Sequence, residues 1–331
     1  MSRQPTTDLY FRNAMGPWIK RWWRAGPIRA FGQSSFIAGD WFVLVRRDHP
    51  RIMREALAWG GRLAYVIDDD VAAGMACDAL PERYRARLAE FERGFHRDLL
   101  ARADVVLAAS DALADALTAE PRMQRRLAPR LMRIDPVWRQ PLADLAHFDR
   151  LEGPATLRMV LLGPGTQRAA LAQVAPAVLA LLDRHKTLSF TYFANRSIAP
   201  ALEKHPRARR LEPMTWREYQ RWMSRQRFHL ALYPLAQTPF DRARSASKLT
   251  EHAILGAAAR YPDSGAPARA LGEGALLAPD NPAQWEDAIE SAITARTALR
   301  GVAQQARDLL MRQDPAQAQR ALWQGILGTT D

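Results

Sequence analysis

The stretch PFDRARSASKLTEHAILG, residues 239–256, follows the apolar run FHLALY of residues 228–233, and together they largely decide the fold. The apolar run has the length of a buried strand. The later residues have helical spacing, which gives an apolar stripe at positions 246, 249, 253 and 256. A strand passing into a helix is where α/β proteins bind phosphorylated ligands, because the helix N-terminus offers free N–H groups.

Polar side chains gather at this predicted junction. Ser245, Lys248 and His252 would lie together beside the apolar stripe, and Arg242 or Arg244 would add charge-assisted hydrogen bonds to a diphosphate. Glu251 would accept hydrogen bonds from ribose hydroxyls. The competing interpretation is a solvated amphipathic helix with ordinary surface charges.

The rest of the chain alternates between strand-length apolar runs and amphipathic helical stretches. This alternation predicts the α/β class, with parallel sheets covered by helices on both faces. The expected strands are Trp41–Val45, Arg62–Ile67, Asp104–Ala108, Leu157–Leu162, Leu188–Phe193, Phe228–Tyr233 and Ala275–Ala278. The expected helices are Arg51–Trp59, Glu82–Leu100, Asp111–Leu117, Arg168–Leu182, Trp216–Arg225, Ser245–Leu255, Ala283–Leu299 and Ala303–Ile326.

The alternation breaks over residues 136–154, which hold three prolines, a glycine and several charges. Such a segment is typical of a boundary between domains. We therefore expect a first Rossmann-like domain over residues 41–150 and a second over residues 151–331, the latter ending in helices. Residues 1–40 form a separate basic, tryptophan-rich segment, in which Trp18, Trp22 and Trp23 either contact a membrane interface or cap the core of the first domain.

Composition narrows the class of protein and its partners. The 331 residues are 48% hydrophobic and carry a formal net charge of +12, which favours anionic partners without choosing among them. The single cysteine, Cys77, excludes an internal disulfide framework and fits a reducing compartment. With neither a signal peptide nor a membrane span evident, we expect a soluble cytoplasmic protein.

Three carboxylates, Asp68, Asp69 and Asp70, end the predicted strand of residues 62–67. Asp68 and Asp70 match a short Asp-x-Asp pattern that can hold a Mg²⁺ or Mn²⁺ ion bridged to a nucleotide-sugar diphosphate. They can equally hydrogen-bond an acceptor substrate or cap the next helix. The catalytic residues are not determined by sequence, and these three are the candidates.

A glycine-containing loop, GPGTQR of residues 163–168, lies between a predicted strand and a predicted helix. Gly163, Gly165 and Thr166 would let the backbone approach an anionic ligand, although a simple turn explains them as well. The loop lacks the dinucleotide fingerprint and the P-loop lysine.

In order and content, these motifs resemble the glycosyltransferases of the GT-B fold, in the group of bacterial group-1 enzymes that build surface polysaccharides. The resemblance rests on DWFVLVRR at 40–47, YVIDDD at 65–70, ADVVLAASDAL at 103–113, and LYPL at 232–235 followed by the stretch at 239–256. It covers residues 40–300 and implies two Rossmann-like domains facing a cleft.

By this resemblance, Ser245, Lys248 and Glu251 are contacts to a nucleotide-sugar donor, and residues 163–166 form a loop facing the cleft. It implies sugar transfer to a cell-envelope glycan or lipid-linked acceptor bound by the first domain, with the donor as co-substrate and no required metal or other cofactor. We expect peripheral contact with the inner membrane through the tryptophans and no nucleic-acid partner.

The sequence departs from the family pattern at the positions that would carry catalysis. Ala243 stands eight residues before Glu251, so the paired glutamates of the family are absent, and no proline follows Gly256. Two other functions therefore stay open. One is a metal-dependent, GT-A-like transferase using Asp68 and Asp70, and the other is a non-catalytic protein with this fold that binds membrane or nucleic acid through its basic surface.

Overall fold

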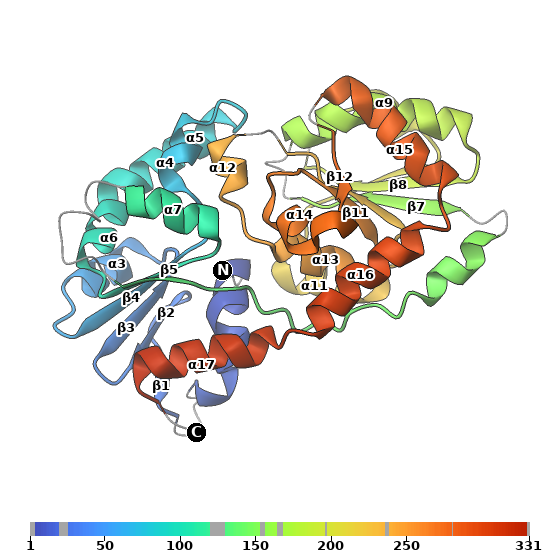
Figure 1. Cartoon of the computed structure of the whole chain (residues 1–331). Coiled ribbons are helices and arrows are strands. Elements are labelled where there is room, and N and C mark those ends of the chain that lie inside the picture. Colours follow the sequence, from blue (N-terminus) through green and yellow to red (C-terminus); the bar gives the residue numbers. More distant parts are fainter. Residues whose placement is uncertain are drawn as a thin grey trace.

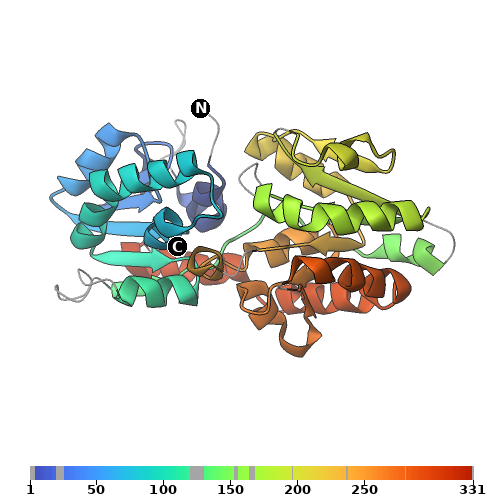
Figure 2. The ribbon, with the colours of Figure 1, turned by 90° about the horizontal axis from the view of Figure 1, so that it is seen from above.

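A computed structural model of the chain describes residues 4–19, 26–119, 130–152, 156–163, 168–195, 197–235, 238–279 and 281–329. The chain folds into two α/β halves, each built on its own sheet, that lie side by side (Figures 1 and 2). Two stretches join the halves: the extended segment that follows the first sheet, and the C-terminal helix (Figure 1).

The first sheet has the strand order β1-β2-β3-β4-β5-β6. Strands β3 to β6 are parallel, whereas β1 and β2 form an antiparallel edge next to β3. The strands are β1 (Ile28–Ala30), β2 (Ser35–Ala38), β3 (Trp41–Val45), β4 (Arg62–Ile67), β5 (Val105–Ala108) and β6 (Arg130–Arg133). Residues 28–38, predicted as part of a separate N-terminal segment, thus belong to this sheet.

Helices cover both faces of the first sheet. One face packs against α3 (Pro50–Leu57), α4 (Val71–Ala76), α5 (Glu82–Phe91), η3 (Glu92–His96), α6 (Arg97–Arg102) and α7 (Asp111–Ala119). The other packs against the N-terminal turns α1 (Pro5–Thr7), η1 (Asp8–Arg12), α2 (Asn13–Met15) and η2 (Gly16–Trp18). Trp18 packs against this core beneath the Arg320 guanidinium, 5.2 Å from its ring centre, while Trp22 and Trp23 lie outside the described residues.

The second sheet is parallel throughout, with strand order β12-β11-β10-β7-β8-β9. Its strands are β7 (Leu157–Leu161), β8 (Leu188–Phe193), β9 (Ala208–Leu211), β10 (Leu230–Leu232), β11 (Ala258–Tyr261) and β12 (Leu276–Leu277). One face carries α9 (Arg168–Arg184) and α15 (Trp285–Thr294). The other carries α11 (Trp216–Arg225), α13 (Ser247–Ile254), α14 (Ala266–Leu271) and α16 (Leu299–Met311). The short elements η4 (Ala146–Glu152), α10 (Pro200–Lys204), α12 (Pro239–Arg242), η5 (Gly272–Gly274) and η6 (Pro282–Gln284) lie in the connections.

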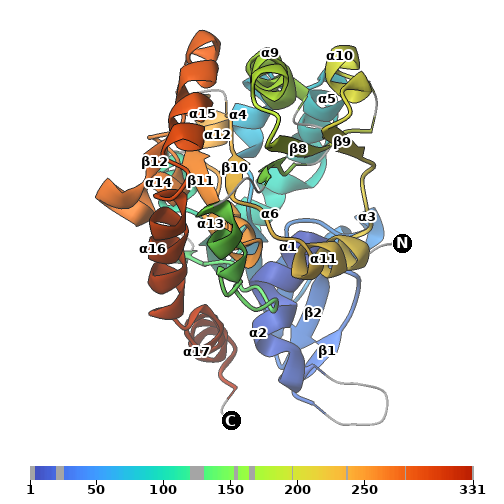
Figure 3. The ribbon, with the colours of Figure 1, turned by 90° about the vertical axis from the view of Figure 1, so that its right-hand side faces the viewer.

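The last helix, α17 (Pro315–Leu327), leaves the second half and packs on the first, beside α2 (Figure 3). Its Trp323 is fully buried there, and the indole N–H donates to the carbonyl of Tyr10 over 2.9 Å. A second crossing contact joins α11 to the N-terminal turns, where Trp216 Nε1 donates to Asp8 Oδ2 over 2.9 Å. The two halves are therefore held together by two buried tryptophans, one on α17 and one on α11, that both contact the N-terminal turns.

The α/β class, every expected strand and the helical C-terminus are confirmed, with strand ends shifted by up to two residues. Five strands escape prediction: β1, β2, β6, β9 and β11. All five are edge strands or lie next to an edge, and β6 and β9 each contain two arginines, so their hydrophobic signal is weak. In the part of the chain that the structure describes, we find no helix with both the length and the apolar character needed to cross a bilayer.

Candidate functional site

The candidate site lies where the two halves meet, at the carboxyl ends of β4 and β10. Helix α12 lies beside α4 of the first half (Figure 1). The Phe240 ring of α12 packs closely on Gly74 of α4, where a Cβ atom would stand only 3.0 Å from that ring. Ser110, just after β5, donates from its hydroxyl to the carbonyl of Ala243 over 2.6 Å. Ligands of open α/β sheets bind at such strand ends, so this junction is where a ligand held by both halves would lie.

The first half contributes a cluster of two aspartates around Arg46. The Arg46 guanidinium forms an ion pair with Asp69 and lies 3.4 Å from Asp68 Oδ1. Thr6 Oγ1 donates to Asp68 over 2.7 Å, and the Tyr84 hydroxyl donates to Asp69 over 3.3 Å. Burial raises the pKa of Asp68, and the neighbouring Arg46 opposes that rise. The two carboxylates thus share the Arg46 cation but accept hydrogen bonds from different hydroxyls.

Arg46 itself has a strained backbone, with φ of +60° directly after β3. A non-glycine residue in this region costs free energy, and such residues gather at functional sites. The conformation turns the chain so that the guanidinium, only 24% exposed, meets the acidic end of β4.

Asp70 has a different role from its two neighbours. Its carboxylate accepts a hydrogen bond from Ala73 N over 2.9 Å and caps the N-terminus of α4. Of the three interpretations given to the aspartates, capping is therefore the one that Asp70 satisfies. Among the described histidine, cysteine, aspartate and glutamate side chains, no group of three is arranged to hold a metal ion.

The second half contributes the connection between α12 and α13. Arg244 donates from Nε to Asp241 Oδ1 over 3.0 Å and lies over the Phe240 ring, 5.0 Å from its centre. Burial acts to lower the pKa of Arg244, but the nearby Tyr233, Asp69 and Asp241 raise it above its usual value. A cation from the second half therefore interacts with the acidic cluster of the first.

Ser245 faces the N-terminal turns of the first half. Burial and the charge of Asp68 raise the pKa of the Tyr10 hydroxyl, and a hydrogen bond with Ser245 opposes the rise. Two residues further on, Ser247 Oγ accepts a hydrogen bond from Trp138 Nε1 over 3.2 Å. Both serines of the quoted stretch are thus held by residues far away in the sequence.

Lys248 and Glu251 lie one turn apart on α13 and form an ion pair with each other. The Tyr219 hydroxyl, on α11, donates to the same Glu251 oxygen over 3.3 Å. Burial, together with the charge of Glu251, raises the pKa of that hydroxyl. The two predicted donor contacts are therefore neighbours in a largely buried network.

Several details of the quoted stretch differ from the prediction. Helix α13 begins at Ser247 rather than Ser245, because residues 243–246 form the connection from α12. His252 does not join Ser245 and Lys248, since it is buried and its Nδ1 hydrogen-bonds the Tyr261 hydroxyl over 2.9 Å. Leu249 and Ala253 are buried as the apolar stripe requires.

The remaining predicted site residues are only partly described. Arg242 ends α12 and is exposed. Gly163 follows β7 and is half-buried, whereas Gly165 and Thr166 lie outside the described residues. The structure thus brings Arg244 and Ser245 of the α12–α13 connection together with Lys248 and Glu251 of α13, and it brings Asp68 and Asp69 to the opposite side of the junction.

Sequence reasoning misses several residues of the junction, namely Thr6, Tyr10, Arg46, Ser110 and Tyr219. Arg46 and Ser110 have a usable signal, because each follows an apolar strand and lies in a segment that carries the family resemblance. The others reach the site through tertiary contacts over large sequence separations.

Comparison with known proteins identifies the architecture. No protein-family model matches the chain, and no curated protein matches its sequence. Solved structures do match. The α,α-trehalose-phosphate synthase (UDP-forming) of Burkholderia vietnamiensis has a TM-score of 0.55 at 15% identity, over 85% of this chain and 68% of that one. An E. coli trehalose-6-phosphate structure scores 0.54 at 15% identity, over 85% and 71%. A mutant of S. aureus TarM scores 0.54 at 12% identity, over 85% and 54%.

These matches confirm the GT-B architecture, with two Rossmann-like halves and C-terminal helices, that the sequence resemblance predicts. At these identities the likeness concerns the fold.

Proposed function

We propose that this protein is a glycosyltransferase that moves a sugar from a nucleoside diphosphate donor to a cell-envelope glycan or a lipid-linked acceptor. The observation that carries the proposal is that the α12–α13 connection and the first turn of α13 hold Arg244, Ser245 and Lys248 near the strand ends of a GT-B fold. The main chemical need of the reaction is to stabilise the departing diphosphate, and cations together with a helix N-terminus do this.

The matched structures support this choice of substrate. The E. coli trehalose-6-phosphate structure contains bound UDP-2-fluoro glucose, and the TarM mutant is in complex with UDP, fondaparinux and α-GlcNAc-glycerol. Both proteins thus bind a uridine nucleotide on this fold. We extend the class of ligand, a nucleotide sugar, to the present chain.

In this proposal the second half binds the donor. Arg242, Arg244, Ser245 and Lys248 bind the diphosphate, and Glu251 accepts from the ribose hydroxyls. Gly163, Gly165 and Thr166 contribute further contacts to the donor. Because Lys248 is paired with Glu251 and Arg244 with Asp241, the donor must replace these internal partners with its own charges.

The first half binds the acceptor near Asp68 and Asp69, and neither a metal nor another cofactor is required. The acceptor oxygen forms a bond to the anomeric carbon while the bond from that carbon to the diphosphate breaks. Asp68 is the candidate for taking the acceptor proton, because burial raises its pKa while Thr6 fixes its carboxylate. Asp70 is occupied by its capping role.

Titration calorimetry with UDP-, GDP-, dTDP- and CMP-sugars tests the donor site. We expect one class of nucleotide to bind, and Lys248→Ala and Glu251→Ala each to weaken it at least tenfold. Lys186→Ala, at an exposed lysine of the same half, is the matched control and leaves affinity unchanged. Absence of binding across the panel refutes the proposal, and unchanged affinity in both variants refutes the site assignment.

Turnover assays separate the competing functions. Loss of activity in EDTA with recovery in Mn²⁺ favours the metal-dependent alternative, and turnover without metal excludes it. Donor binding without turnover, together with salt-sensitive binding to liposomes or nucleic acid, favours the non-catalytic alternative.

We also propose a cytoplasmic location with peripheral contact to the inner membrane through the segment that contains Trp18, Trp22 and Trp23. The net charge of +12 supports attraction to anionic lipid. Sedimentation with vesicles of phosphatidylglycerol tests this contact. Because Trp18 packs against the core, Trp22 and Trp23 are the pair to replace with alanine. That change lowers the bound fraction if the proposal holds, and leaves it unchanged if charge alone governs binding.

A further inference from the structure

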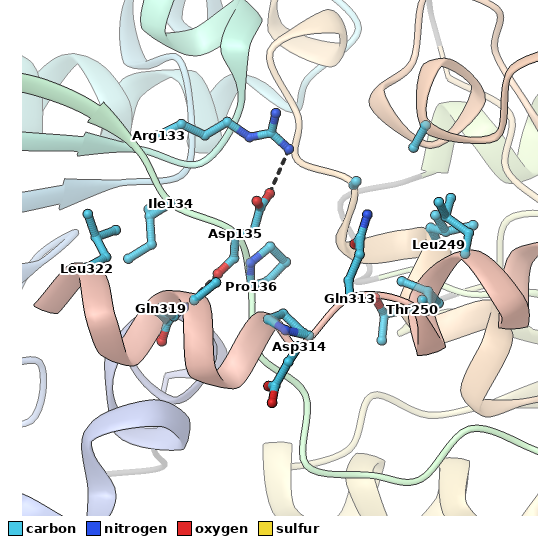
Figure 4. Close-up of a pocket in the computed structure, with 16 residues that line it drawn as sticks. Arg133, Ile134, Asp135, Pro136, Leu249, Thr250, Gln313, Asp314, Gln319 and Leu322 are labelled. Atoms are coloured by element: carbon cyan, nitrogen blue, oxygen red, sulfur yellow. Dashed lines mark hydrogen bonds and ion pairs between the residues drawn. The ribbon is translucent and has the colours of Figure 1, made fainter.

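A cavity of about 590 Å³ lies between the two halves, lined by residues other than those of the proposed donor site. Figure 4 shows Ile134 and Leu322 on one side and Leu249 and Thr250 on the other, with the bend between α16 and α17 at Gln313 and Asp314 between them. A volume of this size suits a small organic ligand. Neither Lys248 nor Glu251 lines it.

Aliphatic side chains form a large part of the cavity wall. Ile134 and Leu249 are buried, whereas three leucines that line it, Leu309, Leu310 and Leu322, are only half-buried. Aliphatic side chains from both halves therefore face the same partly open space, and no aromatic side chain is among the lining residues that the structure describes. Such walls favour a flexible alkyl chain over a stacked ring.

One polar group of the lining is left without a partner. Gln319 is 3% exposed, and its Nε2 donates to the carbonyls of Leu9 and Asp135 over 3.0 and 2.6 Å. Its Oε1 is buried and accepts no hydrogen bond from any described residue. A buried acceptor without a donor is costly, so a ligand hydroxyl that reaches it gains more than it would at an exposed amide.

The charges of the lining do not favour an anion. Arg133 donates to Asp111 over 2.9 Å and to Asp135 over 2.8 Å, the latter pair drawn in Figure 4, and these carboxylates offset its charge. Asp314, at the bend, adds a further carboxylate. With one arginine against two carboxylates in the lining, Asp135 and Asp314, the polar part of the ligand is expected to donate hydrogen bonds and to carry no negative charge.

We propose that this cavity is a second binding site, which takes a small neutral amphiphile with an unbranched alkyl chain and a hydroxylated head. The chain lies against Ile134 of the first half and the leucines of α13, α16 and α17, and a hydroxyl of the head donates to Gln319 Oε1. Because its walls come from both halves, the ligand stabilises their present arrangement and raises the melting temperature as its concentration increases.

Calorimetric titration of the full chain with n-octyl β-D-glucopyranoside, kept below its critical micelle concentration, tests the proposal. Saturable binding with one site per chain is expected, and n-octyl phosphate, with the same alkyl chain but an anionic head, binds at least tenfold more weakly. Absence of saturable binding overturns the proposal, as does equal affinity for the two heads.

A pair of phenylalanine substitutions on α17 locates the site. Ala318 lines the cavity, so Ala318→Phe fills it and weakens octyl glucoside at least tenfold. Ala321 is exposed on the same helix and is not among the lining residues, so Ala321→Phe changes affinity less than twofold. Equal affinity in the two variants overturns the assignment. Circular dichroism melts check that both variants fold, and donor binding in the same samples tests the donor site separately.

Discussion

Gly256 ends the quoted stretch and contacts the segment that joins the two halves, so replacing it tests how that segment holds α13. Its φ is +69°, which a side chain disfavours by about 1–2 kcal/mol. A Cβ would also stand 2.7 Å from His147 Cε1 and 2.9 Å from the Ala143 methyl. The imidazole cannot easily retreat, because its Nε2 hydrogen-bonds the Phe228 carbonyl over 2.9 Å. Forced overlap in a packed site adds about 1–3 kcal/mol, so Gly256→Ala is expected to cost about 2–5 kcal/mol in total.

Urea denaturation followed by circular dichroism measures this loss of unfolding free energy. Gly328→Ala is the matched control, since Gly328 follows α17 with φ of +66° and no atom lies within 4 Å of the point where its Cβ would stand. The control therefore reports the backbone cost alone, about 1–2 kcal/mol. If both variants lose the same free energy, the contact with His147 and Ala143 contributes nothing and the reasoning is wrong.

Three further predictions concern the junction and its charges. Ser110→Ala removes the cap of α7 and leaves the Ala243 carbonyl without its donor, so unfolding free energy in urea falls by about 2–4 kcal/mol; a loss below about 0.5 kcal/mol contradicts this. Burial lowers the pKa of His229 from 6.5 to about 4, so the unfolded chain binds more protons within that window. The unfolding free energy keeps its full His229 contribution above pH 6.5 and decreases by about 3 kcal/mol as the pH falls towards 4. Urea midpoints that stay unchanged between pH 7 and pH 5 contradict this prediction. Arg46→Met leaves Asp69 without its counter-charge and lowers unfolding free energy by about 3 kcal/mol at pH 7, which the same urea titration measures; no loss means that the ion pair is dispensable.

The sequence predicts those parts of the fold that depend on local pattern. Strands such as β4 and β8 are apolar runs of strand length, so their positions follow from hydrophobicity alone. Strand β11 is Ala-Ala-Arg-Tyr and has no such signal, although all four residues are buried. It is a strand because it pairs with β10 and β12 on either side. Tertiary pairing of this kind is not visible in a single stretch of sequence.

Like the fold, the candidate site can be predicted from sequence only in part. A strand followed by a helix indicates where a phosphorylated ligand would bind, so the spacing alone points to Ser245, Lys248 and Glu251 as the proposed donor contacts. It does not point to their partners, because Tyr10 and Tyr219 come from elements with no motif of their own. The position of α17 escapes prediction for the same reason, since its amphipathic pattern shows an apolar face without showing which half covers it.

The internal pairing of the junction has a consequence for donor binding. Lys248 is neutralised by Glu251, Arg244 by Asp241, and Arg46 by Asp69, so the charges suited to a diphosphate are already satisfied within the chain. Binding must exchange each internal pair for a pair with phosphate, and the net gain is the difference between two charge-assisted contacts rather than the full strength of one. The hydrogen bond from Ser110 to the Ala243 carbonyl, which joins the halves across this site, adds a further contact that a closing or opening motion would have to break. In the proposed donor site, a donor that supplies two phosphates replaces several of these pairs together, so we expect a nucleoside diphosphate to bind more tightly than a monophosphate.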